Sequence, residues 1–217
     1  MRVLFIMFML ALAVPAGTAQ ADSLDDEALE KTKGIVEDIV RSSFPEIKSH
    51  KIRYKSFASR ENFFKSRFSV WRYATFQRMR HLIYVNPFAF RGELTENALR
   101  AVIAHELAHV SYYTRKNRLE LLGLIRLTSG KSNREFERKA DLEAIAKGFG
   151  EGLIEYRRWL YSNVSQEVKK SKQKIYFTPP EILLVKKALK EKPELLSKWR
   201  KDIPHDIESI RNQTRYE

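Results

Sequence analysis

The sequence predicts an α+β fold in which a small sheet of about three strands packs on a mainly helical body. Between residues 51 and 85, apolar and polar residues alternate with a period of two, which is typical of half-buried strands. After residue 95, apolar residues recur at the helical period almost throughout. Hydrophobic residues make up 43% of the 217 residues, which is enough for one sizeable core. The absence of cysteine excludes disulfides, thiolate zinc sites and cysteine nucleophiles.

The first 21 residues have the features of a cleavable secretory signal. Arg2 provides a positive charge before the apolar run 3–14, and Ala19-Gln20-Ala21 provides the small residues that a signal peptidase accepts. This run is too short to cross a bilayer core of ~30 Å as a helix. We therefore expect an exported chain, periplasmic or extracellular, that is not integral to the membrane after cleavage. An uncleaved anchor or a buried helix is the alternative.

A first helix is predicted over residues 24–43, where apolar residues lie at helical spacing. Ser23 can cap its N-terminus, and Pro45 ends it. The acidic residues of its first turn suit the positive end of the helix dipole: they are Asp25, Asp26 and Glu27.

Three strands are expected next, and their order in the sheet stays open. They cover residues 52–57, 68–75 and 82–85. In the first strand, Lys51, Arg53 and Lys55 form a basic face. Asn86-Pro87 ends the third strand, because proline cannot continue a ladder of backbone hydrogen bonds.

The rest of the chain is predicted to be helical. Thr95 can cap a helix that reaches about Tyr113, and Thr178 can cap another that has proline in its first turn. Ser132 and Glu135 form an S-x-x-E capping box for a helix that ends near Gly148 or Gly150. Further helices are expected at 119–127, at 153–170, and around Glu194 and Asp206, with a linker at 169–174.

Residues 105–109, His-Glu-Leu-Ala-His, form an H-E-x-x-H pattern. On a helix, residues i and i+4 share one face, so His105 and His109 can bind one metal ion while Glu106 holds a water beside it. Two core histidines satisfied by hydrogen bonds are the alternative, but they leave Glu106 unexplained. A third histidine at position 115 with glycine at 112, as in metzincins, is excluded by Arg115 and Tyr112.

A carboxylate on the next helix is the better candidate for a third ligand, because the other histidines are only His50, His81 and His205. Glu135 is explained as part of the capping box, whereas Glu137 has no such explanation. Asp141 lies one turn after Glu137 and can accept the second N–H of a ligand imidazole. Glu143 is the weaker competitor, and solvated charges on an exposed face are the alternative.

HELAH at 105–109 followed by ERKAD at 137–141 resembles the gluzincin metallopeptidases, whose signature is HExxH…ExxxD. It is most similar to the branch with heat-shock proteases, CaaX-prenyl proteases and their small soluble relatives. The resemblance covers about residues 80–150. It implies a zincin-like fold, a strand at 82–85 bordering the cleft, and one Zn²⁺ per chain. It also implies these roles: metal ligands His105, His109 and Glu137, catalytic base Glu106, and supporting residue Asp141.

After the signal peptide of residues 1–21, we expect residues 22–150 to form a zincin-like metallopeptidase domain, as the resemblance implies. Residues 151–217 are then a basic helical C-terminal part of the same domain. The expected function is a secreted or periplasmic zinc-dependent endopeptidase, in which Glu106 activates a water beside zinc. The oxyanion-stabilising residue stays open among Tyr112, Tyr113, Tyr176 and His205. A substrate could also add to the strand at 82–85 if that strand lies at an edge.

The chain is basic, with 40 Lys and Arg against 27 Asp and Glu and a net charge of +13. Such a charge predicts attraction to acidic partners: a protein or peptide substrate, or an anionic cell-envelope surface. No nucleic-acid partner is expected, because no binding motif accompanies the charge. Two alternatives remain: a zinc-stabilised, catalytically inactive relative, and a cationic partner-binding protein in which the H-E-x-x-H pattern is accidental.

Overall fold

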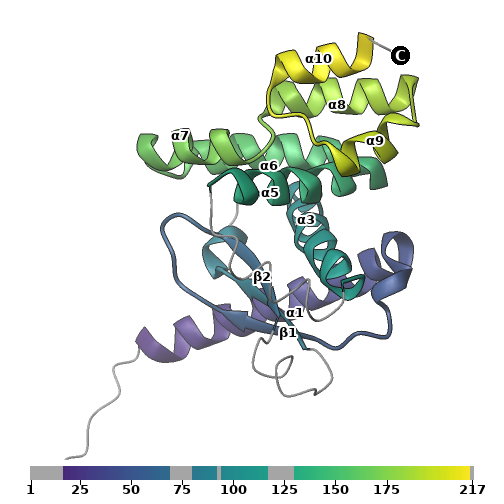
Figure 1. The fold of residues 1–217 in the computed structure, drawn as a ribbon. Helices are drawn as coiled ribbons and strands as arrows, with labels where there is room; N and C mark the ends of the chain where they lie inside the picture. Colours follow the sequence, from purple (N-terminus) through teal and green to yellow (C-terminus); the bar gives the residue numbers. More distant parts are fainter. Residues whose placement is uncertain (1–16, 69–79, 92–93, 117–129, 216–217) are drawn as a thin grey trace, which may run out of the picture.

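The computed structural model describes residues 17–68, 80–91, 94–116 and 130–215. The α+β class is confirmed, with a three-stranded mixed sheet and a larger helical part. Figure 1 shows the sheet and α1 at one end of the molecule, the C-terminal helices at the other, and α3 between them. The predicted helix at 119–127 and almost all of the predicted strand at 68–75 lie outside the described residues.

Helix α1 (Gly17–Ser43) packs Ile35, Val36 and Ile39 into the core. It ends before Pro45, as predicted, and a short turn η1 (Pro45–Ile47) follows. The predicted cap at Ser23 is wrong, because the helix begins at Gly17 and passes through that residue. Alanine and glutamine before Ser23 are good helix formers, so the backbone hydrogen bonds continue upstream. None of the helices in the described ranges combines the length and apolar character needed to cross a bilayer.

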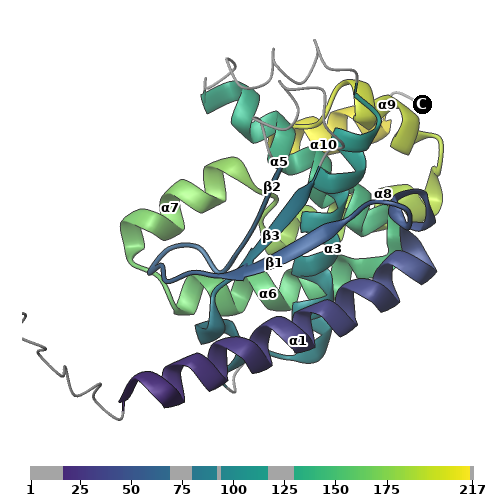
Figure 2. The ribbon, with the colours of Figure 1, turned by 90° about the horizontal axis from the view of Figure 1, so that it is seen from below.

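The sheet has the order β1-β3-β2. Strand β1 (Ile52–Ser56) pairs in parallel with β3 (His81–Val85), and β2 (Phe64–Phe68) pairs antiparallel with β3, as Figure 2 shows. Arg53 and Lys55 are exposed, so the basic face of β1 is confirmed. Because β3 is central, the suggestion that a substrate adds to the 82–85 strand is wrong. The edge strand β2 was missed, since the small Ser66 occupies an inward position and obscures the alternation.

Helix α3 (Glu96–Thr114) is the centre of the fold, and nearly all of its side chains from Ala98 to Val110 are buried. A short turn η2 (Pro87–Phe90) precedes it. The Thr95 hydroxyl accepts a hydrogen bond from Ala98 N at 3.1 Å, which confirms the predicted N-cap. The helix packs on α1 and β2 on one side and on α5 and α6 on the other. Its buried position explains why the H-E-x-x-H segment is flanked by apolar residues.

Helix α5 (Gly130–Ala144) continues through a π-helical turn η3 (Ile145–Phe149) into α6 (Gly150–Ser162). The predicted capping box is wrong, because α5 begins at Gly130 and Ser132 lies inside it. Gly148 has φ = 93°, a left-handed conformation that favours glycine, and it separates α5 from α6 near the predicted end. At Gly152, an added Cβ would lie 2.3 Å from Asn97 O, so glycine allows α6 to approach α3 closely.

The predicted helix at 153–170 is two helices, because α6 ends at Ser162 and Ser165 caps α7 (Gln166–Ile175) by accepting from Val168 N. The predicted linker at 169–174 is therefore wrong and lies within α7. Helix α8 (Pro179–Glu191) has the predicted Thr178 cap, with Glu181 completing a capping box. The expected short C-terminal helices are α9 (Leu195–Lys201) and α10 (Ile207–Arg215).

His81 predicts a pH dependence of stability. Its side chain is fully buried, neither ring nitrogen has a hydrogen-bond partner among the described residues, and the His50 ring lies 5.6 Å away. Burial, with a smaller contribution from His50, lowers the pKa of His81 from 6.5 to about 4. The unfolded chain therefore takes up a proton near pH 6.5, whereas the folded chain does so only near pH 4. The free energy of unfolding should therefore fall by up to about 3 kcal/mol as the pH is lowered through this window.

Urea unfolding of the wild type and a His81→Leu variant at pH 7.5 and pH 4.5 measures this contribution. The loss of stability on acidification should be smaller in the variant. Equal losses in the two proteins would contradict the assignment to His81.

Candidate metal centre

Helix α3 carries His105, Glu106 and His109 at the middle of the molecule. Each has at most 6% of its surface exposed. The two imidazoles lie one helical turn apart, with ring centroids 4.8 Å from each other and planes at 89°. The His109 ring also stacks on Phe136, with centroids 4.4 Å apart, so packing fixes its orientation. The sequence spacing therefore places both imidazoles on one buried face, as predicted.

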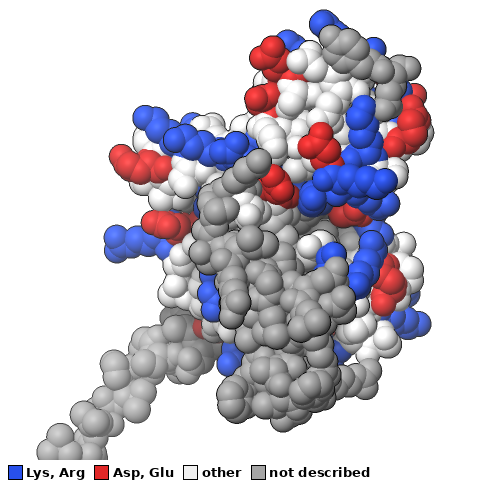
Figure 3. All heavy atoms as spheres, in the orientation of Figure 1, with Lys and Arg blue, Asp and Glu red and all other residues white. Residues whose placement is uncertain are grey.

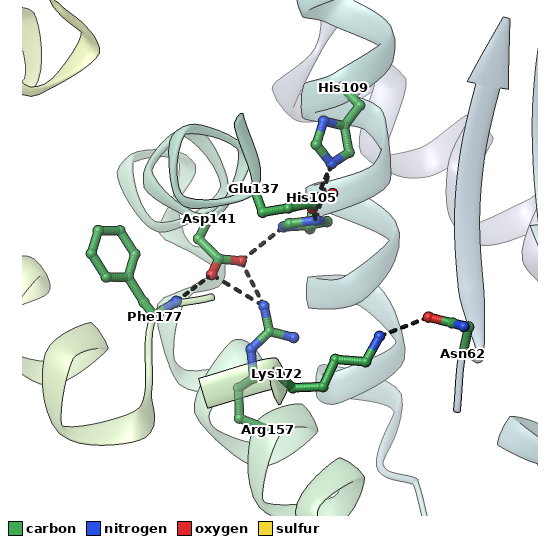
Figure 4. A network of polar contacts seen from close by, with 8 residues as sticks. All are labelled: Asn62, His105, His109, Glu137, Asp141, Arg157, Lys172 and Phe177. Atoms are coloured by element: carbon green, nitrogen blue, oxygen red, sulfur yellow. Dashed lines mark hydrogen bonds and ion pairs between the residues drawn. The ribbon is translucent and has the colours of Figure 1, made fainter. Parts of the chain in front are cut away.

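Helix α5 brings the Glu137 carboxylate to these imidazoles (Figure 4). Glu137 Oε2 lies 3.1 Å from His105 Nε2 and 3.1 Å from His109 Nε2, and the two nitrogens are 3.2 Å apart. A tetrahedral zinc ion with bonds of ~2.0–2.1 Å holds its ligand atoms ~3.3 Å from one another. Two imidazole nitrogens with one carboxylate oxygen also form a donor set that catalytic zinc sites use. This buried group could therefore hold a metal ion.

The protonation of His105 depends on whether a cation is bound. Asp141 Oδ1 lies 2.8 Å from His105 Nδ1, and a carboxylate only accepts, so Nδ1 carries the proton. In the neutral ring, Nε2 then directs a lone pair at the Glu137 carboxylate, which is repulsive unless a cation lies between them. Without a cation, burial opposes the charged ring, but Asp141 and Glu137 raise the pKa of His105 to about 10, so the ring is charged and Nε2 donates to Glu137. Burial likewise opposes the charged Glu137, but the two imidazoles hold its pKa well below the usual range.

Asp141 is fully buried and joins four parts of the chain. Besides His105, it accepts hydrogen bonds from Arg157 Nη2 on α6, at 2.8 Å and 3.1 Å, and from Phe177 N at 3.0 Å (Figure 4). Burial would raise the pKa of Asp141, but Arg157 and His105 lower it overall, so the carboxyl is ionised. A carboxylate that accepts from a ligand imidazole orients the ring and raises its basicity.

Arg157 was not predicted. It appears in the sequence as one of two adjacent arginines, Arg157 and Arg158, in α6, a pattern that is also typical of solvated side chains, and only the fold brings it to Asp141. Its side chain is 3% exposed, and its guanidinium also lies 4.4 Å from the centroid of the Tyr176 ring.

Glu106 lines a small cavity beside His105, together with Tyr156 and Tyr176. The cavity has a volume of about 30 Å³, which is room for one or two water molecules. Within the part of the chain that the structure describes, the Glu106 carboxylate makes no hydrogen bond or ion pair, so it is available to such a water. One candidate ligand, His105, and a second, unpaired carboxylate thus line the same small cavity.

The remaining candidates lie away from this cavity. Glu135 lies between α3 and α5 on the far side of His109, and Glu143 binds Arg200, with Oε2 2.9 Å from Nη2. Tyr112 and Tyr113 pack with Phe136 at 5.5 Å and 5.9 Å between ring centroids. His205 precedes α10, where its backbone N–H binds Ser209. Of the four oxyanion candidates, only Tyr176 lines the cavity, with its ring 5.8 Å from that of His105.

Comparison of the chain with family models, with curated proteins and with solved structures finds no match. The geometry of this centre is therefore the basis for assigning a function.

Proposed function

We propose that the protein is an exported zinc-dependent endopeptidase with a zincin-like arrangement of its active-site helix, sheet and ligand-bearing second helix. One observation carries this proposal: three metal-ligand atoms converge beside a water-sized cavity that the unpaired Glu106 also lines. A purely structural metal site has no need of either the cavity or the additional carboxylate. The apolar run and small residues before position 22 support export, to the periplasm or the extracellular space.

The chain's own residues have distinct tasks in this reaction. His105, His109 and Glu137 hold the ion, and Asp141 keeps His105 in the tautomer that leaves Nε2 free. A bound zinc ion would supply Lewis acidity and lower the pKa of a water to about 7. Glu106 takes a proton from this water while the oxygen of the water adds to the peptide carbonyl carbon. Glu106 then gives the proton to the nitrogen as the carbon–nitrogen bond breaks.

Tyr176 is the phenol best placed to stabilise the oxyanion in this proposal. Burial, with a smaller contribution from Glu137, raises the pKa of Tyr176 well above its ordinary value. The hydroxyl therefore keeps its proton at neutral pH and can donate it to a carbonyl oxygen that gains negative charge.

The surface charge is consistent with an acidic partner. Figure 3 shows Lys and Arg on this face spread over several elements, α7 among them, and interspersed with Asp and Glu. Such a distribution raises the local concentration of anionic ligands over much of the surface rather than at one patch. A protein or peptide substrate and an anionic cell-envelope surface are the partners that we propose.

We expect about one zinc per chain in purified, remetallated residues 22–217. A Glu137→Ala variant should lose this zinc or bind it far more weakly, because one of three protein ligands is gone. Glu135→Ala is the matched control: it removes a carboxylate from the same helix but should keep the zinc. Metal analysis after dialysis measures all three proteins. A folded wild-type chain without zinc would contradict the proposal, as would equal zinc in Glu137→Ala.

A Glu106→Gln variant should keep its zinc but lose peptide hydrolysis by at least ~100-fold, because the amide cannot accept the water proton. Cleavage of a denatured protein substrate, followed by mass spectrometry, measures the loss. Cleavage at the wild-type rate would exclude Glu106 as the base. A zinc-bearing wild type that cleaves nothing would instead favour a zinc-stabilised protein without protease activity.

A further inference from the structure

Lys172 bridges the two walls of the cavity beside Glu106. Its ammonium on α7 donates a hydrogen bond to Asn62 Oδ1, just before β2, at 2.7 Å (Figure 4). Both residues line the cavity. With a volume of about 30 Å³, the cavity is far too small for a peptide while this bridge is closed. Access to Glu106 from this side therefore requires that Lys172 and Asn62 separate.

A larger groove shares part of its lining with this cavity. It has a volume of about 890 Å³, and Glu61 and Phe63 line both the groove and the cavity. Asn62, the partner of Lys172, lies between these two residues in the chain. A peptide in the groove would therefore lie next to the segment that holds Asn62, the partner of Lys172.

The ammonium of Lys172 differs from the buried cations near it in its partner. Arg157 pairs with Asp141 at 2.8 Å, and Arg138 pairs with Glu181 at 2.9 Å. Lys172 has no carboxylate within ion-pair distance among the described residues, and the amide oxygen of Asn62 is neutral. A carboxylate acceptor would add the attraction between opposite charges, which the neutral amide does not supply. Its positive charge at the cavity is thus only partly compensated by the protein.

Lys172 and Arg157 line the cavity together with the carboxylates of Glu61 and Glu106. Helix α7 has no buried residue, so it can shift with little loss of core packing when the bridge opens. Within the zinc-peptidase function proposed above, on which this step rests, we propose that Lys172 binds a carboxylate of the peptide substrate. That carboxylate replaces Asn62 Oδ1 as the acceptor of the ammonium.

The carboxylate can come from the C-terminus of the peptide or from an Asp or Glu side chain, and three peptides distinguish these sources. One has a neutral sequence and a free C-terminus, the second is its C-terminal amide, and the third is a pool of amides with one Glu at each position in turn. Binding is measured on the zinc-loaded Glu106→Gln protein, which should hold peptides without cleaving them. The free acid or members of the Glu pool should bind about tenfold or more tightly than the neutral amide.

A Lys172→Met change in this background should abolish the preference, and Lys172→Arg should retain most of it. Lys170→Met is the matched control, because Lys170 is an exposed cation on the same helix. Zinc content checks that each variant is folded. Equal binding of all three peptides, or a preference that survives Lys172→Met, would overturn the role of Lys172 in binding a carboxylate. Either result would leave the proposed zinc-peptidase function standing. Binding of no peptide would count against peptide recognition, and with it against the proposed function.

Discussion

The hydrogen bond between His105 and Asp141 is the interaction on which the candidate metal centre depends. It joins α3 to α5, and through Arg157 and Phe177 it extends to α6 and to the segment before α8. A fully buried carboxylate is costly unless its oxygens have partners, and those of Asp141 have three. Replacing Asp141 by an apolar residue would leave Arg157 buried without a carboxylate. The geometry of the site and the packing of these helices are therefore coupled.

This coupling assigns a definite role to the C-terminal part of the chain. Residues beyond 150 supply Arg157 and the backbone N–H of Phe177. Both donate hydrogen bonds to the Asp141 carboxylate. The same part supplies Lys172 and Tyr176 to the wall of the cavity beside Glu106. Residues 61–64, at the start of β2 and just before it, form the opposite wall of this cavity. The centre is thus built from both halves of the chain, with α3 as the shared element.

The parts of the site that follow a local rule could be predicted from the sequence. The i, i+4 spacing of His105 and His109 places them on one face of a helix, and Asp141 follows Glu137 by one turn for the same reason. Arg157 and Lys172 could not be found in this way, because their partners are distant in sequence and a cation on a helix is usually solvated. Their position depends on how α6 and α7 pack, and local periodicity carries no information on that packing.

The fold shows the same division between local and non-local features. The caps at Thr95 and Thr178 follow from short-range hydrogen bonds and were predicted. The central position of β3 depends on pairing with two strands from different parts of the chain, and the spacing of apolar residues does not determine it. Helix starts were misplaced at Ser23 and Ser132 because a serine is a good cap only where the preceding residues are not themselves helical.

X-ray absorption at the zinc edge, on the zinc-loaded chain, tests the central claim most directly. Two imidazole nitrogens, one carboxylate oxygen and one water should surround the ion at ~2.0–2.1 Å, in a four-coordinate site. Loss of the two-imidazole signal in a His109→Ala variant, but not in His205→Ala, would assign the ligands to α3. A six-coordinate spectrum without imidazole, or one that His109→Ala leaves unchanged, would contradict the account.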